Sequence, residues 1–292
     1  MPPCGSMPTA AGALEEFSLL KSRVISASFL ILFLAAIVVF NDIFPLALNI
    51  AVAVISVFAV IEIVKALGLA RKLVLLTPSL VFAAVTPFLP GSFWHSIAYY
   101  VYTVVLFSSL ILYHETVTFR EAGVIYSMTI LIPTALETLL SILTIGGSHG
   151  MFYVIIAVFA AWVSDVGAFA AGSLWGKHKL CPSISPKKTV EGLIGGFILN
   201  IAAMLVFGLV FSWSYGGTVP VNYLTLGLIG LFGSALSVVG DLSFSLIKRS
   251  CHIKDFSNIL PGHGGILDRF DSVIFVAPFV LLLVQVLPIT PV

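Results

Sequence analysis

A dense run of polar side chains lies between Asp241 and Asp271 in an otherwise strongly apolar chain, and it reads DLSFSLIKRSCHIKDFSNILPGHGGILDRFD. Helical spacing would place Asp241, Ser245 and Lys248 on one face of a helix. Asp268 and Asp271, three residues apart, would share a face of the next helix. Carboxylate oxygens suit Mg²⁺, which typically takes one or two carboxylates together with substrate phosphates. The stretch predicts a divalent-metal site with Asp241, Asp268 and Asp271 as catalytic residues and metal ligands.

Basic side chains are interleaved with these acids and predict a phosphate site beside the metal. They are Lys248, Arg249, Lys254 and Arg269, and the Ser245 hydroxyl lies nearby. We assign a catalytic role to Lys248 and substrate binding to the others. Cations of this kind neutralise phosphate oxygens, and phosphoryl-type transfer needs mainly positioning and charge neutralisation. The glycine-rich turn at 261–265 allows close approach of backbone to a ligand. His263 within it could contact phosphate, transfer a proton or only bind backbone.

A second polar segment, GSLWGKHKLCPSISPKKTVEGLIGG at 172–196, offers further hydroxyls and cations. Ser185, Lys187, Lys188 and Thr189 could form a second wall of the anion site, or the lysines could only anchor the chain at the membrane surface. The sequence contains neither GxxxxGK[ST] nor GxGxxG, so a P-loop and a Rossmann fingerprint are both excluded.

Acidic residues also occur inside apolar segments, where an ionisable group is costly and marks a functional candidate. Asp165 is a possible additional metal ligand. Glu62 lies one turn from Lys65 and could pair with it, which favours a structural role. Glu137 has no evident partner, and both a structural and a functional role remain open.

Composition determines which elements must position these residues. The chain is 59% hydrophobic and only 9% charged, with mean hydropathy +1.14, whereas soluble proteins are about 25% charged. This excludes a soluble globular protein and predicts an all-α polytopic integral membrane protein, because backbone in lipid must satisfy its own hydrogen bonds. Apolar segments of about 20 residues predict about nine transmembrane helices, at 24–40, 45–64, 73–90, 97–113, 122–145, 151–172, 190–213, 223–247 and 271–288.

Charge placement predicts the orientation. All 14 Lys and Arg residues precede the first segment or fall in alternate loops. The positive-inside rule then places the N-terminus and the polar site in the cytoplasm and the C-terminus outside. We divide the chain into a mobile N-terminal tail or expression-tag remnant (1–16), N-terminal transmembrane helices (17–150) and a catalytic transmembrane region (151–292). Three cysteines without a CxxC pair argue against a disulfide framework and a thiolate zinc site.

The polar segments resemble a known signature. Ser245–Arg249, Lys254-Asp255, Leu260–Gly265 and Asp268–Asp271 are similar to the signature of the CDP-diacylglycerol synthases, also called phosphatidate cytidylyltransferases. The upstream pieces 164–168 and 184–192 also resemble that family, with Phe169 where tyrosine is expected. The resemblance is specific over roughly 160–275, whereas 17–150 is similar only as an array of hydrophobic helices.

The resemblance implies an enzyme of phospholipid biosynthesis that transfers CMP from CTP to phosphatidic acid and releases pyrophosphate. It implies dependence on Mg²⁺, with a second metal or K⁺ as a further cation. Asp241, Asp268 and Asp271 would hold the metal, and phosphates would bind Lys187, Lys188, Lys248, Arg249 and Lys254. We further expect a bacterial cytoplasmic membrane, contacts with membrane lipids, a homodimer and no nucleic-acid partner.

Two other functions fit parts of the sequence, and a third is disfavoured. A CTP-dependent polyprenol kinase would form a phosphorylated polyprenol and CDP instead of CDP-diacylglycerol and pyrophosphate. An ion-coupled transporter would line its path with Glu137, Asp165 and Asp241, although the polar residues cluster at one face. A CDP-alcohol phosphotransferase is disfavoured because its DGxxAR motif is missing.

Overall fold

The computed structural model describes residues 43–259 and 264–290. Within them, seven helical segments are long and apolar enough to cross a membrane. They are α2 (Ala47–Ala66), α4 (Gly91–Leu112), α5 (Phe119–Ile145), α6 (Gly150–Trp175), α7 (Val190–Ser214), α8 (Tyr223–Ser250), and α9 (Leu267–Phe270) continued by α10 (Val273–Val286). The prediction of an all-α polytopic integral membrane protein is confirmed.

The predicted count of nine helices stays a prediction. The first segment, 24–40, lies outside the described residues, as does the tail at 1–16. The segment at 73–90 is a shorter helix, α3 (Leu73–Val85), followed by a 3₁₀ turn at Thr86–Phe88. A second 3₁₀ turn, Gly147–His149, precedes α6.

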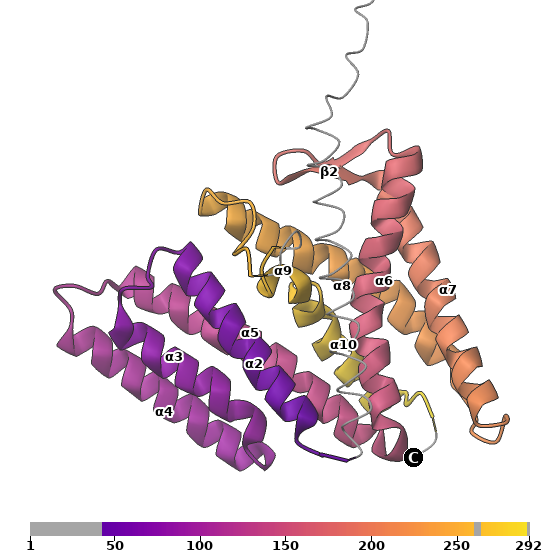
Figure 1. The fold of residues 1–292 in the computed structure, drawn as a ribbon, viewed down its shortest axis with the longest axis horizontal. Helices are drawn as coiled ribbons and strands as arrows, with labels where there is room; N and C mark the ends of the chain where they lie inside the picture. The colour runs from indigo at the N-terminus through magenta and orange to yellow at the C-terminus, as the bar shows by residue number, and fades with distance from the viewer. Residues whose placement is uncertain (1–42, 260–263, 291–292) are drawn as a thin grey trace, which may run out of the picture.

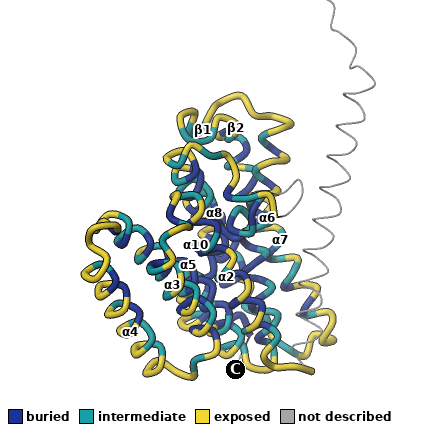
Figure 2. Tube along the Cα trace, turned by 60° about the vertical axis from the view of Figure 1, so that its left-hand side comes forward, coloured by how far each residue is buried: buried dark blue, intermediate teal, exposed yellow. Residues whose placement is uncertain are grey.

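The helices form two groups joined by a central pair (Figure 1). Helices α2 to α5 run side by side in one group, and α6 packs along α7 in the other. Between them, α8 contacts α6 and α7, and α10 contacts α5, α6 and α8. Burial is concentrated where these helices meet, whereas much of α4 faces outward (Figure 2).

Glycines allow α6 and α7 to approach closely. A Cβ added at Gly192 would lie 2.6 Å from the carbonyl oxygen of Ala168, and one at Gly196 would lie 2.9 Å from that of Ser164. This small-residue spacing of four is typical of membrane helix contacts. Asn200 extends the contact to a third helix, because its buried Nδ2 donates to Ala160 O of α6 (2.8 Å) and Gly230 O of α8 (3.1 Å).

The loop between α6 and α7 differs from the all-helical expectation. It forms an antiparallel hairpin of β1 (Lys179–Cys181) and β2 (Ser185–Thr189). Proline at 186 cannot donate to a helix and pushes the residue before it towards extended backbone. The hairpin rises above the ends of α6 and α7 (Figure 1), where it can cover one side of a site at the membrane surface.

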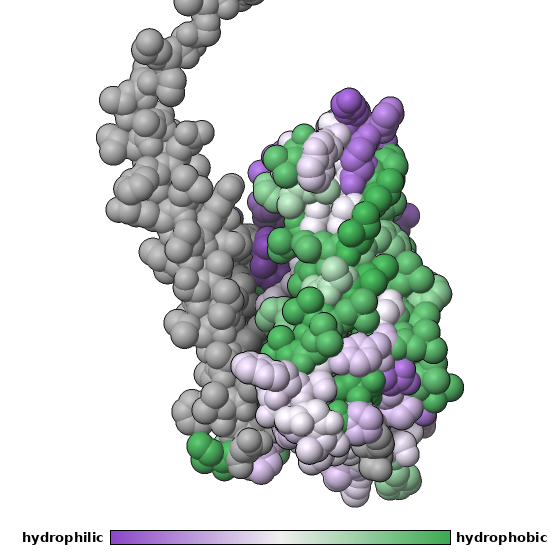
Figure 3. Space-filling model, turned by 90° about the vertical axis from the view of Figure 1, so that its right-hand side faces the viewer, coloured by the Kyte–Doolittle hydropathy of each residue, from purple (hydrophilic) through white to green (hydrophobic). Residues whose placement is uncertain are grey.

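The basic loops of the described residues gather at one end of the bundle. Lys72 Nζ donates to Thr116 O (2.5 Å), which joins the loops after α2 and α4. Ser257 Oγ donates to Glu62 Oε1 (2.5 Å), which joins the loop after α8 to α2. In Figure 3 hydrophilic residues occupy this end, and the face below it is mostly hydrophobic. The carboxyl end of the chain lies at the opposite end (Figure 1).

Candidate functional site

A cavity of about 510 Å³ lies at this basic end. It is bordered by the hairpin, the adjoining ends of α6 and α7, the middle of α8, and the α9–α10 segment. Nine of the predicted residues line it: Asp165, Ser185, Lys187, Lys188, Thr189, Asp241, Asp268, Arg269 and Asp271. The two polar segments identified in the sequence therefore face one cavity.

Three helices bring carboxylates together in it. Ser272 Oγ lies 3.0 Å from Asp165 Oδ2 and 3.4 Å from Asp271 Oδ1, so α6 and the start of α10 place two carboxylates around one hydroxyl. Asp165 Oδ1 also accepts from Ser237 Oγ (2.8 Å). Asp241 of α8 lines the same cavity. We call Asp165, Asp241 and Asp271 the carboxylate cluster.

The chemistry of this cluster fits Mg²⁺, because it supplies hard oxygen donors. Within the residues that the structure describes, no three acidic, histidine or cysteine side chains converge into a ready-made metal site. Mg²⁺ does not require one, since it keeps several waters and completes its shell with substrate phosphates. Among the predicted ligands, Asp241 and Asp271 are in the cluster, and Asp165 joins them.

Asp268 lines the same cavity, but its carboxylate oxygens already have partners. Oδ1 accepts from Lys248 Nζ (2.6 Å), and Oδ2 accepts from the backbone N–H groups of Phe256 (2.9 Å) and Gly265 (2.8 Å). The ion pair is nearly inaccessible, with 10% and 4% of the two side chains exposed. These contacts fold the loop after α8 onto α9. Metal ligation by Asp268 stays a prediction, and the geometry favours a role in positioning.

Three cations face the cavity: Lys187, Lys188 and Arg269. Lys188 pairs with Asp241, so the hairpin is held against α8. The buried Nε of Arg269 has no hydrogen-bond partner among the described residues, and an unpaired buried donor is costly. Trp162 Nε1 donates to Arg269 O (2.9 Å) and fixes the backbone from which this side chain extends.

The other predicted substrate-binding residues lie around the cavity rather than in it. Lys248 is buried against Asp268, and its Nζ lies 5.3 Å from the ring centre of Phe256. Arg249 is exposed and donates to Ile253 O (3.1 Å), and Lys254 is also exposed. These cations do not line the cavity.

Two hydroxyls have local structural partners. Ser245 Oγ donates to Asp241 Oδ1 (3.2 Å), which confirms the shared helix face. Thr189 Oγ1 accepts from Gly192 N (3.1 Å) and caps α7. His263 lies outside the described residues.

Glu62 of α2 has a structural role, with partners that the sequence did not indicate. Lys65 was a candidate partner, but the buried carboxylate of Glu62 accepts from Ser257 Oγ (2.5 Å), Ile266 N (3.0 Å) and Leu267 N (2.7 Å). It thus holds the segment just before Asp268 and Arg269. A signal was present, since an acid in an apolar segment needs compensation, but its partner lies about 200 residues away.

Comparison with known proteins now adds to this geometry. Residues 21–287 match the profile of the cytidylyltransferase family. The chain belongs to the cytidylyltransferase family. The match spans most of the chain and includes every predicted site residue, so the resemblance noted in the sequence is confirmed at the level of the family.

Several curated relatives are named phosphatidate cytidylyltransferase. The protein from Bacillus subtilis is 41% identical over 180 residues, which cover 62% of this chain and 64% of that protein. The protein from Staphylococcus saprophyticus is 43% identical over 140 residues, 48% of this chain and 52% of that protein. The protein from Staphylococcus aureus is 42% identical over 139 residues, which cover 47% of this chain and 51% of that protein. The chain thus aligns with less than two thirds of the length of these relatives.

Family membership indicates which ligands the cavity must suit, because cytidylyl transfer brings a nucleoside triphosphate to a nucleophile. In this cytidylyltransferase-family chain, cations on the hairpin and α9 face carboxylates on α6, on α8 and between α9 and α10. That arrangement can hold polyanions beside a divalent cation, at one end of a bundle of apolar helices.

Proposed function

We propose that the protein transfers CMP from CTP to phosphatidic acid, giving CDP-diacylglycerol and pyrophosphate for phospholipid biosynthesis. The observation that carries this proposal is the single cavity that joins the carboxylate cluster to Lys187, Lys188 and Arg269. Its position at one end of a lipid-embedded bundle suits a reaction between a water-soluble nucleotide and a membrane lipid. The names of the relatives supply the substrate pair.

The reaction requires little covalent help from the protein. A phosphate oxygen of phosphatidic acid forms a bond to the α-phosphorus of CTP, and the bond from that phosphorus to the bridging oxygen breaks, so that pyrophosphate leaves. The attacking oxygen is already anionic, so a strong general base is not needed. Lys187, Lys188 and Arg269 would screen the repulsion between the two polyanions. Asp268, Lys248 and Glu62 would hold the loop and α9 in place.

Mg²⁺ is part of this proposal, with Asp165, Asp241 and Asp271 as the residues that would hold it. When bound, it would neutralise phosphate charge and orient the phosphates. We also propose that a second metal ion or K⁺ binds, and that the protein forms a homodimer.

The decisive experiment identifies the lipid product. Purified protein is incubated with CTP labelled at the α-phosphate, phosphatidic acid and Mg²⁺, and the lipids are analysed by mass spectrometry. We expect labelled CDP-diacylglycerol and one pyrophosphate per turnover. Omission of Mg²⁺ and the variant Asp271→Asn are the controls. In a parallel incubation with a polyprenol and CTP labelled at the γ-phosphate, labelled polyprenyl phosphate with release of CDP would instead support the lipid kinase.

We also propose that the basic end faces the cytoplasm, because Lys and Arg are concentrated in cytoplasmic loops of membrane proteins. Cys181 in β1 and Cys251 after α8 are partly exposed free thiols at this end. In intact bacterial cells a membrane-impermeant maleimide should leave both unlabelled, and permeabilisation should make them reactive. Labelling of Cys181 in intact cells would overturn the orientation.

A further inference from the structure

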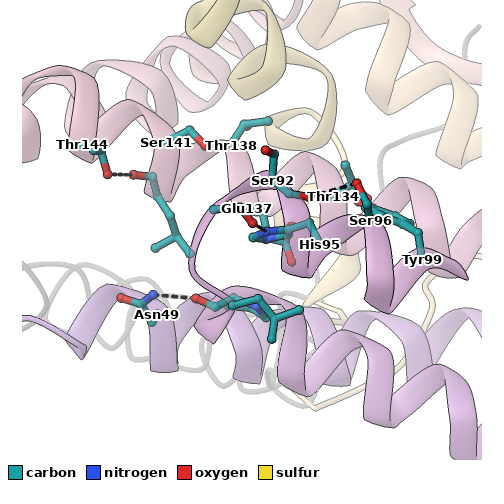
Figure 4. Close-up of a pocket in the computed structure, with 14 residues that line it drawn as sticks. Asn49, Ser92, His95, Ser96, Tyr99, Thr134, Glu137, Thr138, Ser141 and Thr144 are labelled. Carbon is teal, nitrogen blue, oxygen red and sulfur yellow. Dashed lines mark hydrogen bonds and ion pairs between the residues drawn. The ribbon is translucent and has the colours of Figure 1, made fainter. Parts of the chain in front are cut away.

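A second polar cavity lies at the opposite end of the bundle, separate from the proposed active site. Its volume is about 640 Å³, and it is lined by the first turn of α2, the turn after α3, the start of α4 and the last turns of α5. Its polar side chains are Asn49, Ser92, His95, Ser96, Tyr99, Thr134, Glu137, Thr138, Ser141 and Thr144. Figure 4 shows them gathered around His95 and Glu137. The two cavities share no lining residue.

Glu137 is a buried acid in this cavity, and one of its carboxylate oxygens lacks a hydrogen-bond partner among the described residues. The residue is 8% exposed, and this oxygen is Oε1. A buried carboxylate oxygen without a partner is expensive, and an ionisable group within a transmembrane helix marks a functional site. The cavity that Glu137 lines is the place from which a partner can reach it.

His95 is the second ionisable side chain of this cavity, and it lies beside Glu137. Its Nδ1 lies 2.9 Å from Gly91 O, and because a carbonyl oxygen can only accept, Nδ1 must carry the hydrogen. In a neutral imidazole Nε2 is then an acceptor, and it lies 3.5 Å from Glu137 Oε2. Two acceptors therefore face each other unless His95 is protonated and donates to Glu137, or a positively charged or hydrogen-donating group is shared between them.

Four further side chains of the wall present acceptors. Ser96, Thr138 and Thr144 donate their hydroxyl hydrogens to carbonyl oxygens of their own helices, at 3.0, 2.5 and 3.0 Å. Their oxygen lone pairs remain available. Asn49 Nδ2 donates to Pro87 O (2.6 Å), and Asn49 Oδ1 remains as an acceptor. Within the described residues no Lys or Arg lines the cavity, so His95 is the one lining side chain that could carry positive charge, and an anion would also meet the Glu137 carboxylate.

We propose that this cavity is a binding site for a ligand that carries an organic ammonium group, with Glu137 and His95 as its principal contacts. An ammonium group supplies positive charge and several N–H donors, which match Glu137, Nε2 of His95 and the hydroxyl oxygens. The volume lies within the range of about 300–1,000 Å³ typical of small-molecule sites, so a bare ion would leave most of it to water. A free amine and the amine headgroup of a zwitterionic lipid share this chemistry.

Two arms of one experiment separate these sources. In the first, ethylammonium is titrated by calorimetry into purified full-length protein in an amine-free detergent. In the second, native mass spectrometry measures retention of phosphatidylethanolamine against phosphatidylglycerol. We expect saturable one-to-one binding in at least one arm. Glu137→Gln should weaken it by about tenfold or more, because a charge-assisted contact is lost. Glu115→Gln, in an exposed loop at the other end, is the matched control and should bind as the wild type does.

Several results would overturn the proposal. They are an absence of saturable binding in both arms, undiminished binding by Glu137→Gln, or K⁺ binding as tightly as ethylammonium. If Glu137→Gln does not fold, His95→Ala replaces it, since His95 is more exposed and alanine has no acceptor to replace the second contact. Unchanged affinity in that variant would equally refute the site. CMP transfer is not a readout here, so failure leaves the proposed reaction unaffected.

Discussion

Replacing Glu62 by glutamine tests how the N-terminal helices support the proposed active site. In the structure Oε1 accepts from Ser257 Oγ and Ile266 N, and Oε2 accepts from Leu267 N. Glutamine keeps the shape but replaces one oxygen by an NH₂ group, which cannot accept. In either orientation at least one of these bonds is lost, and two N–H donors face each other at the backbone of α9.

The size of the effect follows from these contacts. A hydrogen bond to a charged group contributes about 1.5–3 kcal/mol, and each 1.4 kcal/mol corresponds to about tenfold in an equilibrium constant. Glu62→Gln should therefore shift the balance between docked and undocked states of the segment at 264–267 by about tenfold to a hundredfold. Asp268 and Arg269 follow this segment directly, so undocking removes one wall of the cavity.

Two assays measure how far the segment at 264–267 undocks. Hydrogen exchange of peptides covering 264–270 should be faster in Glu62→Gln, and kcat/KM for CMP transfer should fall by up to the same factor. Ser257→Ala removes one hydrogen bond to Glu62 and the longer one that Ser257 Oγ accepts from Ile259 N (3.3 Å), but it leaves the charge, so its effects should be smaller. Glu115→Gln, an exposed change with no contact to the loop, should leave both measurements unchanged.

A folded Glu62→Gln protein with wild-type exchange at 264–270 would refute this reasoning. A lower melting temperature accompanied by unchanged exchange and unchanged kinetics would also refute it. That result would mean that Glu62 stabilises the bundle in general and does not position α9.

Three further changes test the metal site, the anion site and the helix packing. Asp241→Asn removes one charge of the carboxylate cluster and should raise the Mg²⁺ concentration for half-maximal rate by at least about tenfold. Arg269→Ala should lower kcat/KM by about tenfold to a hundredfold through loss of a phosphate contact, whereas Arg249→Ala, outside the cavity, should stay within about threefold. Gly196→Ala would place a Cβ 2.9 Å from a carbonyl oxygen of α6 and should lower the free energy of unfolding by about 1–3 kcal/mol. Gly227→Ala, with open space around it, is its control and should be neutral or stabilising.

Each of these tests has a result that contradicts the assignment. An unchanged Mg²⁺ requirement in Asp241→Asn would remove that residue from the metal site. Equal losses in Arg269→Ala and Arg249→Ala would show that cavity position does not decide phosphate binding. Equal thermal stability of the two glycine variants would contradict the close approach of α6 and α7.

The membrane-embedded helical class followed from the sequence alone. So few charges cannot cover a soluble surface, and apolar runs of membrane length have only the helix available to satisfy their backbone. The family was also recognisable from the sequence, because its signature is local and polar in an apolar chain. Spacing along α8 likewise predicted that Ser245 would lie beside Asp241, which the structure confirms.

Which acids meet was decided only by the tertiary structure. Asp165 joins Asp241 and Asp271 because Ser237 of α8 and Ser272, just before α10, both donate to its carboxylate. Asp268, which looks equivalent to Asp271 in the sequence, turns to Lys248 and two backbone amides. Residues three apart share a helix face, but which neighbours that face meets depends on packing between distant segments.

The same limit applies to Glu62 and Glu137, which look alike in the sequence as isolated acids in apolar segments. The structure pairs Glu62 with backbone amides some 200 residues away and leaves one oxygen of Glu137 facing a cavity. The sequence shows that each buried charge must be compensated, because water is absent within the membrane. Only the folded arrangement supplies the compensating group, because that group comes from a segment far away along the chain or from outside the protein.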